Sequence, residues 1–196
     1  MIKKLLLIFI TLILLMGCVN AIDSSNWTTA NVGYEEFKIP PQYENPYKSD
    51  FHMYEFDEDI DVFTIRYVNP AIMSLYGYFI EHNSYVKKVE VEGHDAVHFC
   101  SFDRNNSKLW FSSGEEFYYI TWIGENITPE IKEIVKSASK SNYTHDEFYD
   151  ILNEEYQNYK IVNAIESQGY DYPRSDSGSH GFVTVGTNGV GFGVIT

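Results

Sequence analysis

The spacing of hydrophobic positions divides the chain into a strand-like part and a helical part. In the first part the apolar runs are short, and Val89 and Val91 alternate with Lys88 and Glu90. Alternation with a period of two predicts a strand with one buried face. This strand covers residues 85–92, and the other predicted strands are residues 32–39, 51–56, 60–68, 95–102, 108–112 and 116–123.

Turn residues between these runs predict two hairpins. Gly93 separates residues 85–92 from residues 95–102, and Ser113-Gly114 separates the last two strands. The segment of residues 70–80 fits a helix as well as a strand. The pattern therefore leaves that segment open.

After Gly124 the period changes to that of a helix. Thr128 is a typical N-cap and Pro129 a typical first helical residue. Thr144 and Glu147 form a capping box that begins a second, longer helix, which is expected to end near Gly169. Apolar residues recur every three or four positions: Ile131, Ile134, Val135 and Ala138 in the first helix, and Phe148, Ile151, Leu152, Tyr156, Tyr159, Val162 and Ile165 in the second.

The order of these elements predicts an α+β fold. Strands followed by helices, without βαβ alternation, favour an antiparallel sheet of about six strands with the two α-helices packed on one face. We expect one such domain over residues 22–172. Residues 173–196 form a polar linker and a Gly-rich tail, and Asn188-Gly189 predicts that the tail is either a last hairpin added to the edge of the sheet or a flexible appendage.

The N-terminal residues predict export. Lys3 and Lys4 precede an apolar run that extends to Met16, which is too short for an ordinary membrane span. Residues 1–21 therefore form a signal peptide or a lipoprotein signal. Cleavage after Ala21 would give a free chain, whereas a lipobox ending at Cys18 would give a lipid-anchored one, and both interpretations stay open.

The cysteine content follows from the same argument. Cys18 is either removed with the signal or acylated, so the remaining cysteine, Cys100, has no second cysteine for an intrachain disulfide. An exported domain without a disulfide depends on its hydrophobic core. Because Val97, Phe99 and Phe102 surround Cys100 in the sequence, we expect the thiol to be buried and slow to react in the folded state.

Charge excludes some partners. The acidic residues all follow the signal, so the mature chain has 12 Lys and Arg against 28 Asp and Glu, a formal charge of −16. Such a surface disfavours nucleic acid, and it leaves the signal or lipid anchor as the predicted contact with a membrane. A cationic partner remains compatible with this charge.

Aromatic residues make up 16% of the chain, with 16 tyrosines. They suit strands, and tyrosine-rich surfaces also contact proteins or glycans. Four Asn-x-Ser/Thr sequences are candidate glycosylation sites at surface positions: Asn26, Asn105, Asn126 and Asn142.

The chain carries no catalytic or cofactor motif that we can assign. His98 and Cys100 share a strand face at a spacing of about 7 Å, which could bring two ligands to one metal. A zinc or copper site needs three or four ligands, so a buried thiol beside a structural histidine is the favoured interpretation. No cofactor is predicted.

Some segments resemble a known family. Phe37-Lys38-Ile39-Pro40, Gly93-His94-Asp95-Ala96 and Thr128-Pro129-Glu130-Ile131 look like the corresponding parts of small exported domains of the PsbP-like type. The resemblance covers residues 32–141 and implies an antiparallel sheet with helices, in an accessory or binding module. The expected function is thus an exported or surface-tethered, non-catalytic binding domain for an envelope protein or glycan. The alternative is an exported hydrolase whose carboxylates assemble only in the fold.

Overall fold

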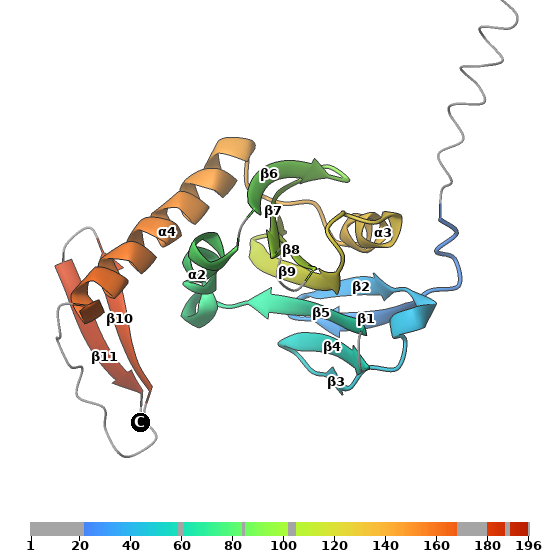
Figure 1. Cartoon of the computed structure of the whole chain (residues 1–196), viewed down its shortest axis with the longest axis horizontal. Coiled ribbons are helices and arrows are strands. Elements are labelled where there is room, and N and C mark those ends of the chain that lie inside the picture. Colours follow the sequence, from blue (N-terminus) through green and yellow to red (C-terminus); the bar gives the residue numbers. More distant parts are fainter. Residues whose placement is uncertain are drawn as a thin grey trace, which may run out of the picture.

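The computed structural model describes residues 22–58, 61–83, 85–101, 105–167, 180–186 and 189–195. The fold is α+β, and its main sheet is antiparallel with seven strands in the order β3-β4-β5-β9-β8-β7-β6 (Figure 1). The sequence predicted about six strands. The bounds are β3 Lys48–Ser49, β4 Met53–Glu58, β5 Asp61–Val68, β6 Tyr85–Val91, β7 His94–Ser101, β8 Asn106–Ser113 and β9 Glu116–Ile123.

The first predicted strand is instead a hairpin. Strands β1 (Thr28–Val32) and β2 (Glu35–Ile39) pair with each other and form a separate two-stranded sheet. The chain reverses at Gly33, whose φ of +60° is a conformation that glycine adopts at little cost. The prediction of one continuous strand over residues 32–39 was therefore wrong. The two hairpins predicted at Gly93 and Ser113-Gly114 are confirmed as β6–β7 and β8–β9.

Both faces of the main sheet carry a hydrophobic cluster. Along β9, Tyr118 and Ile120 belong to one cluster, and Phe117 and Tyr119 belong to the other. Helix α3 (Pro129–Ser137) and the β1–β2 hairpin cover the first face, here called the α3 face. Helices α2 (Leu75–His82) and α4 (His145–Ser167) cover the second, the α4 face (Figure 1).

The prediction that both C-terminal helices pack on one face of the sheet was therefore wrong. The central strands explain this result, because the residues of β9 are buried on both sides of the sheet from Phe117 to Trp122. A strand with two apolar faces needs cover on each side. Helices α3 and α4 supply one cover each.

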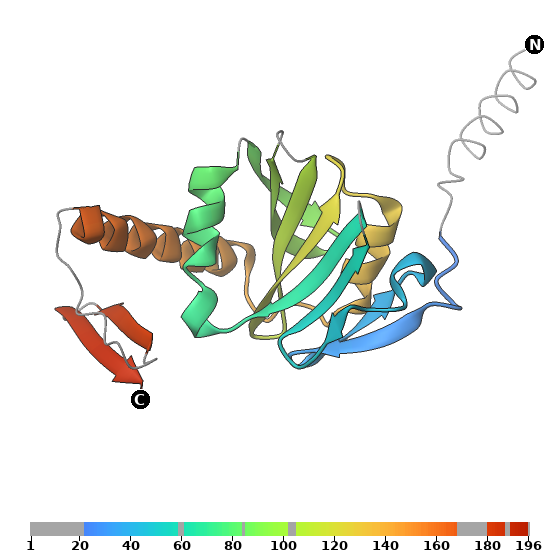
Figure 2. The same ribbon diagram turned by 60° about the horizontal axis from the view of Figure 1, so that its bottom comes forward.

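Local signals fixed the helix starts correctly. The Thr128 side chain accepts a hydrogen bond from the Ile131 N–H at 3.3 Å, and Glu147 accepts one from the Thr144 N–H at 2.8 Å. The open segment of residues 70–80 forms a short 3-10 helix, Pro70–Ile72, followed by α2. Figure 2 shows α4 passing α2 and extending beyond the sheet. None of the helices described here is long and apolar enough to cross a membrane.

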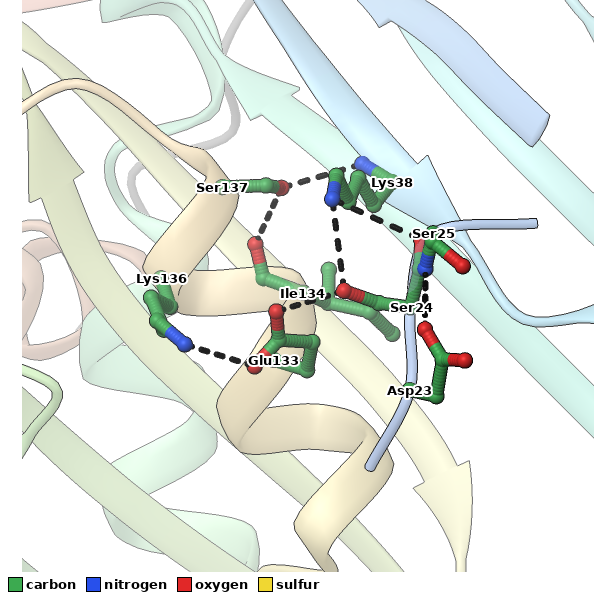
Figure 3. A network of polar contacts seen from close by, with 8 residues as sticks. All are labelled: Asp23, Ser24, Ser25, Lys38, Glu133, Ile134, Lys136 and Ser137. Atoms are coloured by element: carbon green, nitrogen blue, oxygen red, sulfur yellow. Dashed lines mark hydrogen bonds and ion pairs between the residues drawn. The ribbon is translucent and has the colours of Figure 1, made fainter. Parts of the chain in front are cut away.

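The first described residues are fixed to the domain by a polar network (Figure 3). The Ser24 hydroxyl donates to Glu133 of α3 at 2.7 Å, and the Lys38 ammonium of β2 donates to the Ser24 hydroxyl at 3.2 Å. The Ser137 hydroxyl accepts a hydrogen bond from the Lys38 N–H at 2.9 Å. The network thus attaches the N-terminal segment to α3 and β2.

The C-terminal residues form a hairpin of their own. Strands β10 (His180–Gly186) and β11 (Gly189–Ile195) pair with each other and, among the described residues, with no strand of the main sheet. Several predicted features lie outside the described residues: the signal at residues 1–21 with Cys18, the helix end at Gly169, and the linker up to residue 179.

Candidate functional site

The most distinctive surface feature is a group of aromatic side chains beside the β1–β2 turn, here called the aromatic platform (Tyr34, Phe51, Tyr67 and Tyr118). The exposed fractions of Tyr34 and Phe51 are 70% and 46%, whereas Tyr67 and Tyr118 are buried. Tyr34 packs edge-to-face on Phe51 and Tyr67, with ring centroids 5.3 and 5.7 Å apart. Two exposed rings therefore rest on a buried aromatic base.

Backbone contacts hold these rings in place. The Gly33 N–H donates to the Phe51 carbonyl, and the Tyr34 N–H donates to the Tyr118 hydroxyl at 3.2 Å. A Cβ atom at Gly33 would lie 2.9 Å from the Tyr67 ring, closer than real Cβ contacts allow. The turn can approach the base this closely because residue 33 is glycine.

The loop that carries Phe51 is also fixed. The Asp50 carboxylate accepts hydrogen bonds from the His52 and Met53 N–H groups at 2.8 and 3.0 Å. The His52 carbonyl accepts one from the Tyr67 N–H at 2.9 Å. Pre-ordered side chains lose less entropy on binding than mobile ones do. The platform therefore has the rigidity of a recognition surface.

A carboxylate lies at the edge of the platform. The Tyr67 hydroxyl donates to Glu116 at 3.0 Å. Burial, followed by this hydrogen bond, raises the pKa of Tyr67 to about 12. Tyr67 therefore remains a neutral donor at physiological pH, and its hydroxyl holds the Glu116 carboxylate beside the rings.

The chemistry of the platform suits binding. Exposed aromatic faces attract cations and apolar groups, and the nearby carboxylate adds a hydrogen-bond acceptor and a negative charge. The side chains that form the platform supply no thiol and no aliphatic hydroxyl as a nucleophile.

The sequence did not identify this site. Its high tyrosine content indicated an aromatic surface in general, but the residues come from positions 34 to 118 and converge only in the fold. The one local signal is Gly33-Tyr34 directly after Val32, where a two-residue turn leaves a large ring exposed.

His98 and Cys100 lie together on the α3 face of β7, with exposed fractions of 6% and 3%. The His98 ring stacks on Trp122 and packs edge-to-face on Tyr85. Burial lowers the pKa of His98, and the ring Nε2 has no hydrogen-bond partner among the described residues. Over the part of the chain that the structure describes, no three His, Cys, Asp or Glu side chains are grouped as a metal site requires.

The four candidate glycosylation asparagines, Asn26, Asn105, Asn126 and Asn142, are all exposed. They lie in turns or loops, and Asn105 adopts a positive φ of 46°. Their positions leave room for a modification.

A hollow of about 390 Å³ lies between α2 and α4. It is open to solvent, and among the described residues that line it Glu81 supplies the one carboxylate. A glycosidase-type mechanism needs a pair of carboxylates. The hollow is lined by Glu81, His82, Tyr159, Lys160 and Asn163.

No protein-family model matches the chain, and neither the curated proteins nor the solved structures compared with it show significant similarity.

Proposed function

We propose that the protein is an exported or surface-tethered binding domain without catalytic activity, and that the aromatic platform contacts its partner. The observation that carries this proposal is the pair of exposed rings, Tyr34 and Phe51, fixed on a buried aromatic base. Aromatic side chains dominate the energetics of protein interfaces. The sequence resemblance to PsbP-like domains, which are mostly accessory modules, supports the same class of function.

The partner proposed here is an envelope protein with a Lys- or Arg-rich contact segment. Negative charge supports this choice, since the full chain carries a formal charge of −14 and Glu116 lies beside the rings. A cationic side chain gains from both a ring face and a carboxylate. A neutral glycan would contact the aromatic rings but would gain nothing from the negative charge.

Site-specific photo-crosslinking tests the proposal. A photoreactive phenylalanine analogue replaces Tyr34 in the exported protein and, as a matched control, Tyr78, which is 46% exposed on α2. We expect one envelope protein to be captured from position 34 only, through a basic segment, and less efficiently at high salt. Equal capture from both positions, or capture of a glycan, would contradict this partner.

Export itself is tested by the mass of the intact protein recovered from its native envelope. The proposal predicts either an N-terminus at Ile22 or an acylated Cys18. A chain that still begins at Met1 would contradict cleavage at either site, and the same spectrum counts any glycans at the four asparagines. The competing idea of an exported hydrolase predicts substrate turnover at enzyme-like rates by the purified protein.

A further inference from the structure

Strand β6 forms one edge of the main sheet (Figure 1). The opposite edge strand, β3, has only two residues, whereas β6 has seven. All residues of β6 except Val89 and Val91 are exposed. A long, uncovered edge strand is a ready template for pairing with another strand.

The backbone groups of β6 that face away from the sheet follow from its pairing with β7. The Val91–His94 pair closes a two-residue turn and is therefore hydrogen-bonded, and such pairs then alternate along the hairpin. The N–H and C=O groups of Val86, Lys88 and Glu90 consequently point outward. No described residue hydrogen-bonds these outward groups. They are available to a further strand.

The charges on β6 restrict which strand can join it. Lysines on an edge strand usually oppose pairing. Lys88, however, lies over the Tyr149 ring, 3.9 Å from its centroid, and Glu90 lies two residues further along the same face. Two outward-facing residues on the α4 face thus carry opposite charges. An incoming strand with the same two charges in reverse order would match them.

A second copy of β6 that runs antiparallel supplies that order. A two-fold axis at Lys87, Lys88 or Glu90 would place identical charges directly opposite each other, which is destabilising. With the axis at Val89, Lys88 lies opposite Glu90 of the second copy, and the symmetry repeats this pair. Two β-branched side chains then meet at the axis, where they pack well. This register satisfies the backbone groups and the charges together.

We propose that β6 is the interface between two copies of this chain, paired antiparallel about a two-fold axis at Val89. The two main sheets then form one continuous sheet. The outward backbone groups of Lys88 and Glu90 hydrogen-bond across the axis, and their side chains form ion pairs on the α4 face. The interface is separate from the aromatic platform, because Tyr67 and Tyr118 lie on β5 and β9, and β8 and β7 separate these strands from β6.

Cysteine crosslinking of the purified exported protein tests the register. Opposed residues that exchange no hydrogen bonds have Cα atoms about 4.5 Å apart, which suits a disulfide. Under mild oxidation we expect V89C to form a covalent dimer at least about tenfold faster than K87C, whose two thiols would lie about 13 Å apart along the strands. The native thiol of Cys100 is buried and common to both variants.

The control in this experiment is stringent. Lys87 is more exposed than Val89, so random collisions between molecules would favour the K87C dimer. Equal rates of crosslinking, or a faster K87C dimer, would overturn the proposal.

Charge reversal tests the same pairing without a covalent bond. In sedimentation equilibrium, K88E and E90K should each weaken the dimer at least about tenfold, because each variant places like charges opposite each other. The double variant K88E/E90K restores opposite charges and should dimerise as the unchanged protein does. Thermal unfolding checks that all four proteins are folded. A double variant as weak as the single variants, or an unchanged protein that stays monomeric at about 1 mM, would overturn the proposal.

Discussion

At the scale of single residues, Gly33 shows how one position shapes the candidate site. Its φ of +60° reverses the chain, and the absence of a side chain lets the turn lie on the Tyr67 ring. Gly114 has nearly the same backbone conformation, with φ of +57°, but a Cβ atom there would meet nothing within 4 Å. A comparison of substitutions at the two glycines therefore separates the effect of backbone strain from the effect of close packing.

Replacing Gly33 with alanine should lower the free energy of unfolding by about 2–4 kcal/mol, because left-handed strain and a clash with a buried ring add together. The matched variant G114A should lose only about 1–2 kcal/mol from strain. Urea unfolding measures both values. If the two variants lose the same amount, the Gly33–Tyr67 contact does not constrain the turn.

Cys100 is buried, as its apolar neighbours predicted. Its reactivity is not yet tested. In the exported protein, where Cys18 is cleaved or acylated, a thiol reagent should label Cys100 at least about tenfold more slowly in the native state than in urea, since reaction needs an opening of the structure. Rapid labelling of the native protein would show an accessible thiol.

At the scale of elements, helices were predicted better than sheet edges and faces. Thr128-Pro129 and the Thr144–Glu147 capping box are local signals, so both helix starts were correct. Strand β3 contains only Lys48 and Ser49 and has no apolar pattern to find. Which face a helix covers depends on contacts distant in sequence, and the one-face prediction failed for that reason.

The candidate site failed to appear in the sequence for the same reason. Tyr34 and Tyr118 are 84 residues apart, and only the fold joins the N–H of one to the hydroxyl of the other. His98 and Cys100, by contrast, were paired correctly because alternation along one strand is a local rule.

The α2–α4 crossing offers a test at this scale. A Cβ atom at Gly77 would lie 2.4 Å from Tyr159, so the helices touch where glycine leaves room. We expect G77A to destabilise the protein by about 1–2 kcal/mol, as overpacking outweighs the gain in helix propensity. The double variant G77A/Y159A should lose less than the sum of the two single variants in a double-mutant cycle. Additive losses would mean that the two positions are not coupled.

At the scale of the whole molecule, the core is rich in buried tyrosines. Burial raises the pKa of Tyr67, Tyr76 and Tyr149 to about 12, above the ordinary value of 10.0 for a tyrosine. Between pH 10 and 12 the native state keeps protons that the unfolded chain releases. Their contribution to stability is therefore complete below pH 10 and is lost as the pH rises through 12.

The urea midpoint should accordingly fall steeply between pH 10 and 12. The variant Y76F removes one of these groups, so its midpoint should fall less over the same range. Absorbance at the tyrosinate wavelength checks that tyrosines of the native protein ionise at a higher pH than those of the unfolded chain. A midpoint that stays constant from pH 10 to 12 would contradict these pKa directions.

The position of the N-terminal segment determines how a lipid anchor would place the domain. The described N-terminal segment lies at one end of the molecule and the far end of α4 at the other (Figures 1 and 2). If Cys18 carries lipid, only residues 19–23 separate it from Ser24, a reach of at most about 22 Å. In that case the domain would stay close to the membrane, with α4 directed away from it.

The central claim is that the aromatic platform binds the partner, and its most direct test is an affinity measurement. The partner segment captured from position 34 is synthesised as a peptide, and its Kd is measured by calorimetry for the unchanged protein, Y34A/F51A and the control Y47A/Y78A. Tyr47 and Tyr78 are 78% and 46% exposed outside the platform. The account predicts that Y34A/F51A weakens binding by at least about tenfold, as for interface hot spots, and that the control binds normally. Equal affinities for all three proteins would contradict it.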